Sequence, residues 1–129
     1  MARVALDADV VIGFLDASDA QHDKAVELLG ARLATGDDVL IAATVYAEVI
    51  VRPLQHGTDD KVDEFLAAID ADIVDIDRAL ARDAAQLRSK HAALRLPDAI
   101  ALATALAADA QLLTLDRNLQ RIADRERAD

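Results

Sequence analysis

Hydrophobic positions along the chain alternate between short apolar runs and longer segments with helical spacing. The short runs predict buried strands at residues 3–6, 39–42, 73–76 and 112–115. Between them, apolar residues recur every three or four positions, as on one face of a helix. The segments predicted to be helical cover residues 10–15, 20–33, 44–51, 58–71, 77–93 and 97–108, followed by a short helix or a charged tail from residue 117. Strands alternating with helices are typical of a parallel sheet covered on both faces.

Capping and helix-breaking residues refine these boundaries. Thr44 and Asp77 are residue types that cap helix N-termini, so we expect a helix to begin after each of them. Pro53 should end the first of these helices, because the residue before a proline disfavours the helical conformation. Pro97 suits the first turn of a helix, where its missing N–H costs nothing. The helix that follows Pro97 is apolar almost all round and should therefore be central and buried.

The predicted fold is α/β, a three-layer α/β/α arrangement with a central, mostly parallel sheet of four or five strands. A length of 129 residues fits one domain that spans 1–129. No apolar run is long enough to cross a bilayer, and the N-terminus reaches Asp7 too soon for a signal peptide, so we expect a cytoplasmic protein. Ligand sites in parallel sheets lie beyond the carboxyl ends of the strands, where the strand order reverses.

The amino-acid composition excludes several kinds of functional site. The chain has no cysteine, which excludes disulfides, thiolate metal sites and cysteine nucleophiles. Aromatic residues make up only 2%, which argues against a base-stacking platform. The formal net charge of −10 disfavours tight, sequence-independent binding of nucleic acid and favours cations or a basic protein partner.

Four acidic residues occupy positions where a site would form. Asp7 directly follows the first strand and Asp116 the fourth, Glu48 lies one turn into the helix after the second strand, and Asp98 lies in the first turn of the buried helix. In a parallel sheet all four can meet at the same edge. Each also has a structural alternative, because Asp7, Asp98 and Asp116 suit helix N-termini or turns. Glu48 is harder to explain in this way, since its helix is otherwise apolar.

Acids gathered at one edge would need a positive charge between them. Two carboxylates about 4 Å apart repel by roughly 4 kcal/mol at an effective dielectric constant near 20. The three lysines lie in other helices or loops. Ligands that are all oxygen atoms favour Mg²⁺ or Mn²⁺ over Zn²⁺. The natural chemistry is metal-assisted attack of water on a phosphodiester.

Four segments of the sequence, in this order, resemble the motifs of PIN-domain ribonucleases. They are LDADVVI (6–12), TVYAEV (44–49), LPDAIALATA (96–105) and LTLDRNL (113–119). The resemblance covers nearly the whole chain, and its third segment is especially similar to VapC-type toxins of toxin–antitoxin pairs.

The resemblance implies a Mg²⁺- or Mn²⁺-dependent endoribonuclease. Asp7, Glu48, Asp98 and Asp116 would form its acidic tetrad, with Asp7, Asp98 and Asp116 binding metal directly or through water. Glu48 would hold a metal-bound water or a second metal. The Thr114 hydroxyl would contact the metal ligands without binding the metal itself. The family further implies a dimer, or a dimer of toxin–antitoxin pairs, and an antitoxin whose basic segment covers the acidic pocket. Arg95 and Arg117 flank the motifs and are the arginines we expect to hold RNA.

The chain departs from the family pattern in two places. Asp9 stands where the family usually has Asn, Ser or Thr, which makes it an additional candidate ligand and leaves the number of metal ions open. The chain also ends soon after the fourth motif, where family members often have one more strand.

Two other functions remain open from sequence. In a haloacid dehalogenase-type phosphohydrolase, Asp7 would be the nucleophile and Asp9 an acid/base, but the lysine that this family needs has no good counterpart. A receiver-like acidic binding module would likewise lack its lysine after the last strand. His22, His56 and His91 show no metal-binding spacing and are expected at the surface.

Overall fold

The computed structural model describes residues 2–128, in which four strands form one parallel sheet. The strands are β1 (Arg3–Leu6), β2 (Asp38–Ala42), β3 (Asp72–Val74) and β4 (Gln111–Leu113). Their order in the sheet is β3-β2-β1-β4, with Ala5 level with Leu40 on one side and with Leu112 on the other. The chain thus builds outward from β1 to β3 and then crosses to the other side of β1. The strand order reverses between β1 and β4, and the predicted ligand-binding edge lies there.

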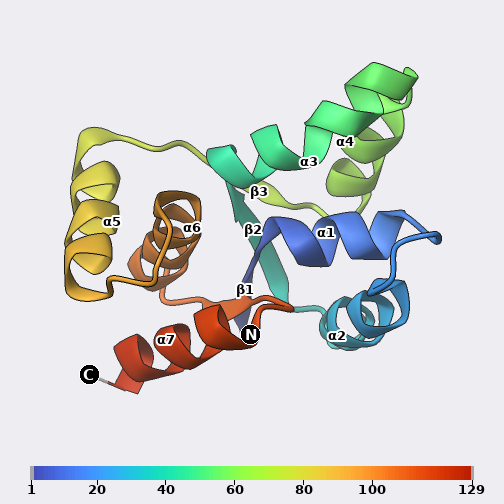
Figure 1. Ribbon diagram of the computed structural model, residues 1–129. Helices are drawn as coiled ribbons and strands as arrows, with labels where there is room; N and C mark the ends of the chain where they lie inside the picture. Colours follow the sequence, from blue (N-terminus) through green and yellow to red (C-terminus); the bar gives the residue numbers. More distant parts are fainter. Residues whose placement is uncertain (1, 129) are drawn as a thin grey trace.

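Seven helices among residues 2–128 cover the sheet and confirm the predicted three-layer α/β/α fold (Figure 1). They are α1 (Ala8–Leu15), α2 (His22–Ala34), α3 (Ala43–His56), α4 (Asp59–Ala68), α5 (Arg78–Lys90), α6 (Leu96–Ala107) and α7 (Arg117–Ala128). In Figure 1, α5 and α6 lie to one side of the sheet, and α1 and α2 to the other. Residues 2–128 contain no fifth strand, and α7 follows β4 instead.

The core centres on β1 and α6. Val4 in β1 and Leu102 in α6 are completely buried, and α6 packs against β1, β2 and β4. The buried face of α6 is rich in alanine, which lets the helix approach the strands closely. The prediction that this helix is central and buried is confirmed. Its N-terminus therefore has a fixed position at the carboxyl edge of the sheet.

Several predicted boundaries are wrong by a few residues. Thr44 is not a cap, because α3 already begins at Ala43. Pro53 lies inside α3, which continues to His56 and ends where Gly57 adopts a left-handed backbone with φ of 69°. A proline in the last turn removes a single backbone hydrogen bond, and the glycine conformation supplies the stronger signal for the helix end.

The observed limits of α5, β4 and α7 also differ from the predicted ones. Asp77 does cap α5, accepting a 2.8 Å hydrogen bond from the Leu80 amide, but α5 ends at Lys90 rather than at residue 93. β4 ends at Leu113, so Thr114 lies beyond the strand and turns toward the carboxyl edge. The segment from Arg117 forms a regular helix of 12 residues, not a tail.

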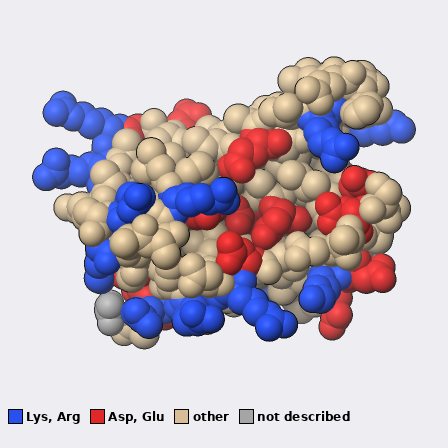
Figure 2. Space-filling model, viewed as in Figure 1, with Lys and Arg blue, Asp and Glu red and all other residues tan. Residues whose placement is uncertain are grey.

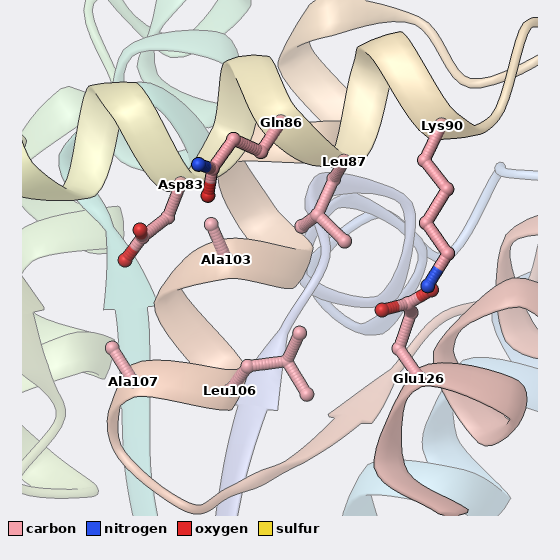
Figure 3. Close-up of a pocket in the computed structure, with 8 residues that line it drawn as sticks. All are labelled: Asp83, Gln86, Leu87, Lys90, Ala103, Leu106, Ala107 and Glu126. Carbon is pink, nitrogen blue, oxygen red and sulfur yellow. The ribbon is translucent and has the colours of Figure 1, made fainter. Parts of the chain in front are cut away.

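A groove of about 430 Å³ lies along α5 and α6, and Lys90 and Glu126 lie at one end of it (Figure 3). The Glu126 carboxylate lies 2.9 Å from Lys90 Nζ and 2.8 Å from His91 Nε2. The side chain of His91 is only 11% exposed, so the expectation that it is a surface histidine is wrong. This cluster holds α7 against the end of α5.

The Glu126 cluster predicts a pH-dependent stability. Hydrogen bonds from His91 and then from Lys90 hold the pKa of Glu126 below its ordinary value. An acid whose pKa is lowered by folding stabilises the protein above its unfolded-state pKa, and this contribution disappears as the pH falls through the folded-state pKa. We expect Glu126→Gln to lower the free energy of unfolding by about 0.5–1 kcal/mol near pH 6.

Urea unfolding from about pH 6 down to about pH 3 would measure this effect. The difference in the free energy of unfolding between wild type and Glu126→Gln should disappear as the pH falls toward the lower end of this range. Glu64→Gln, at an exposed position on α4, is the matched control and should show no gap. A gap that is constant over the whole pH range would contradict the assignment to the Glu126 carboxylate.

Candidate active site

Asp7 lies where the strand order reverses. Its amide donates a 2.9 Å hydrogen bond to the Leu113 carbonyl, which joins the carboxyl ends of β1 and β4. Its side chain is 8% exposed and caps α1, accepting 2.9 Å and 2.8 Å hydrogen bonds from the Ala8 amide and from the Thr114 hydroxyl. The capping alternative for Asp7 is therefore confirmed, and capping leaves the carboxylate at the ligand-binding edge.

The Thr114 hydroxyl contacts three of the acidic residues at this edge. It lies 2.8 Å from Asp7 Oδ2 and 3.2 Å from Asp9 Oδ2, and it accepts a 3.1 Å hydrogen bond from the Asp116 amide. A hydroxyl carries a single proton, so the two carboxylates compete for it. Thr114 thereby fixes the orientation of the Asp7 carboxylate.

Asp9 is drawn into the same network from the first turn of α1. Its Oδ2 accepts a 3.1 Å hydrogen bond from the Leu115 amide, whereas its Oδ1 is buried with no hydrogen-bond partner among residues 2–128. Burial and then the negative charge of Asp7 raise the pKa of Asp9 to about 6. An unpaired buried carboxylate oxygen is costly, and a cation would relieve that cost.

Asp116 caps a helix, as its structural alternative predicted, and its charge also acts on Asp7. Its Oδ1 accepts hydrogen bonds of 2.9 Å from the Asn118 amide and 3.2 Å from the Leu119 amide, and so caps α7. The carboxylate is exposed, and its charge is close enough to raise the pKa of Asp7.

Asp98 and Glu48 reach the edge from two other helices. Asp98 lies in the first turn of α6, and the Arg95 Nε atom lies 3.5 Å from its Oδ2. Glu48 is an exposed residue of α3 whose pKa is raised, first by partial burial and then by the charges of Asp7 and Asp98. Burial, followed after opposing hydrogen bonds by the charges of Asp98 and Asp116, also raises the pKa of Asp7.

Asp7 thus lies within electrostatic reach of each of the other four acids. Figure 2 shows acidic side chains gathered in the middle of the face that it presents. Asp7 and Asp116 reach this edge because they follow strand ends, Asp9 and Asp98 because they lie in first helical turns, and Glu48 because it lies one turn into α3.

Within residues 2–128, no group of three acidic or histidine side chains already has the arrangement of a metal site. Mg²⁺ does not require one, because it keeps several waters and usually binds only one or two carboxylates. The available donors are all oxygen atoms, and Asp9 Oδ1 has no other partner. The donor chemistry therefore fits a hydrated Mg²⁺ or Mn²⁺ ion near Asp7 and the acids within its electrostatic reach.

Of the two predicted RNA-binding arginines, Arg95 is paired with Asp98 and Arg117 is exposed at the start of α7. The Leu115 amide, which fixes Asp9, was missed from sequence. A backbone N–H donor cannot be recognised from a sequence motif, because every residue except proline has one.

A family model of the PIN domain matches residues 4–125. The chain belongs to the PIN-domain family. The match confirms the resemblance found in the motifs and gives no support to the phosphohydrolase and receiver alternatives. A comparison with curated proteins found no match.

Solved structures with the same fold come from toxin–antitoxin systems. A toxin–antitoxin complex from Klebsiella pneumoniae is 25% identical, with a TM-score of 0.70, and the match covers 88% of this chain and 86% of that chain. VapC20 from Mycobacterium tuberculosis, described as a sarcin-ricin loop cleaving toxin, is 16% identical, with a TM-score of 0.75 and coverage of 92% and 93%. VapBC2 from Rickettsia felis, bound to a promoter DNA fragment, is 20% identical, with a TM-score of 0.71 and coverage of 93% and 92%. This PIN-domain chain therefore shares its fold with VapC proteins over nearly its whole length.

Proposed function

We propose that this PIN-domain protein is a Mg²⁺- or Mn²⁺-dependent endoribonuclease that hydrolyses RNA phosphodiester bonds, and that it is the toxin of a type II toxin–antitoxin pair. The observation that carries the proposal is the gathering of Asp7, Glu48, Asp98 and Asp116 at the carboxyl edge of the sheet, where the strand order reverses between β1 and β4. PIN-family membership and the toxin–antitoxin structures with the same fold support it.

The roles of the residues follow from their positions. Asp7, Asp98 and Asp116 would bind the metal directly or through water, and Glu48 would hold a metal-bound water or a second ion. When bound, the metal supplies a water of lowered pKa and polarises the phosphate. Thr114 positions Asp7, with which it shares a buried 2.8 Å hydrogen bond. Asp9 would add a further oxygen ligand.

A basic segment of an antitoxin is the partner that this acidic edge fits. The net charge of −10 favours such a partner over bulk nucleic acid. We further propose a homodimer or a dimer of toxin–antitoxin pairs, located in the cytoplasm. None of the described helices has the length and apolar character needed to span a bilayer.

Cleavage of a labelled single-stranded RNA by the purified protein tests this function. Cleavage should require added Mg²⁺ or Mn²⁺ and stop with a chelator. It should proceed without a trapped phospho-aspartate at Asp7. The same RNA left intact at every metal concentration, or a phosphorylated Asp7, would overturn the proposal.

A further inference from the structure

Helix α7 carries an unusual number of arginines for so acidic a protein. Its 12 residues hold four arginines and two acids, whereas the whole chain has a formal charge of −10. Arg117, Arg121 and Arg125 are spaced four residues apart, so they lie along one exposed side of the helix, about 6 Å apart in rise. The opposite side packs on the core through Leu119 and Ile122. We call Arg117, Arg121 and Arg125 the arginine ridge.

The charge of the arginine ridge is not neutralised by the rest of the described chain. Among residues 2–128, none forms an ion pair or hydrogen bond with the guanidinium groups of Arg121 and Arg125. Of the two acids of α7, Glu126 is paired with Lys90 and His91, and Asp124 accepts a 3.0 Å hydrogen bond from Gln120, so neither forms an ion pair with the ridge. Free guanidinium groups on an exposed helix face are available to an anionic ligand.

The arginine ridge starts directly beside the acidic edge. It begins at Arg117, next to Asp116 of the acidic edge, and α7 then runs for about 18 Å back along the sheet. Figure 2 shows a row of basic side chains over the position that α7 has in Figure 1, below the acidic side chains.

We propose that the arginine ridge binds the phosphate backbone of the RNA substrate and leads it away from the acidic edge along α7. This inference rests on the proposed ribonuclease function and specifies how the substrate is held. Guanidinium groups bind phosphate oxygens in a bidentate fork, and such contacts position a strand without reading its sequence. The surplus negative charge is screened beyond about 8 Å at physiological salt, so these nearby arginines decide the contact. A regular row that starts at the predicted cleavage site favours a continuous polyanion over an acidic protein partner.

Binding of fluorescent single-stranded RNA to the full chain, followed by anisotropy over a range of salt concentrations, tests the inference. Asp98→Asn serves as the background in every sample, so that the RNA is not cut. Arg121→Gln/Arg125→Gln should weaken binding on the order of tenfold and lower the salt slope by about 1.4, for two lost single-strand phosphate contacts. Arg78→Gln/Arg82→Gln on α5 removes the same charge at the same spacing and should leave both quantities unchanged.

A second readout uses cleavage with an otherwise unchanged chain. The ridge variant should raise KM and leave kcat as in the wild type, because its residues hold RNA away from the reacting atoms. Equal binding and an equal salt slope in the ridge and control variants would overturn the inference, as would a ridge variant that loses affinity only for an acidic polypeptide such as polyglutamate. Ridge-dependent RNA binding by a wild type that never cuts RNA would refute the proposed function while supporting the binding surface.

Discussion

Asp98→Asn is expected to lower metal-dependent RNA cleavage by at least about 100-fold without unfolding the protein. Asparagine keeps the size of the side chain and removes one anionic oxygen donor. Loss of a partner behind a metal ligand already costs about 10–100-fold in activity, so loss of a ligand itself should cost at least as much. Asp98 opens α6 at the carboxyl edge, and its charge contributes to the raised pKa of both Asp7 and Glu48.

The structural cost of Asp98→Asn should be small. The substitution weakens a 3.5 Å contact with Arg95, whose side chain is 79% exposed, and exposed ion pairs contribute about 0–1 kcal/mol. Single-turnover cleavage assays across a range of Mg²⁺ and Mn²⁺ concentrations would measure the effect. Asp83→Asn on α5 is the matched control and should be fully active. Wild-type activity in Asp98→Asn would show that the metal lies elsewhere.

Thr114→Val should destabilise the protein by about 1–3 kcal/mol at neutral pH, although valine has nearly the same shape. The variant leaves Asp7 Oδ2 buried without its 2.8 Å donor and removes the hydroxyl that lies between the Asp7 and Asp9 carboxylates. The Thr114 hydrogen bond holds down the pKa of both Asp7 and Asp9, so both pKa values should rise further. We also expect metal affinity to fall about 10–100-fold, because Thr114 orients a proposed ligand.

The pH dependence of the Thr114→Val effect has a definite sign. Acids whose pKa is raised by folding bind more protons in the folded state, so the metal-free protein gains stability as the pH falls through those values. The deficit of Thr114→Val should therefore be largest above the Asp9 pKa of about 6 and shrink below it. Urea unfolding without metal at about pH 7.5 and about pH 5 measures the deficit. Thr114→Ser keeps the hydroxyl and should behave like the wild type; a Thr114→Val protein as stable as Thr114→Ser at both pH values would contradict the assignment.

The sheet and most helices were predictable because each burial pattern is local. Arg3–Leu6 is a short apolar run that ends in an acid, and residues 97–108 are apolar on nearly every side. The helix limits were less predictable, since Pro53 and Gly57 compete to end α3 and the glycine conformation decides. The segment after Arg117 was ambiguous because it has few apolar residues. Its apolar face, with Leu119 and Ile122, stabilises a helix only when it packs on the core.

In the candidate site, too, some features could be predicted from the sequence and others could not. Asp7, Glu48, Asp98 and Asp116 could be singled out because acids at strand ends or in apolar helices are conspicuous in sequence. The pairing of Arg95 with Asp98 could not be predicted, because the orientation of an exposed side chain depends on its neighbours in space.

By itself, the sequence determined which segments become strands and helices, that no thiolate takes part, and which acids stand at the ends of the strands. These properties follow from hydrophobic periodicity and residue chemistry, both of which act over a few residues. Only the tertiary structure decided that β4 lies beside β1, which brings Thr114 within 2.8 Å of Asp7 and the Leu115 amide within 3.1 Å of Asp9. Contacts between residues more than a hundred positions apart depend on how the strands pair and how α6 packs on them, and no local pattern encodes those distances.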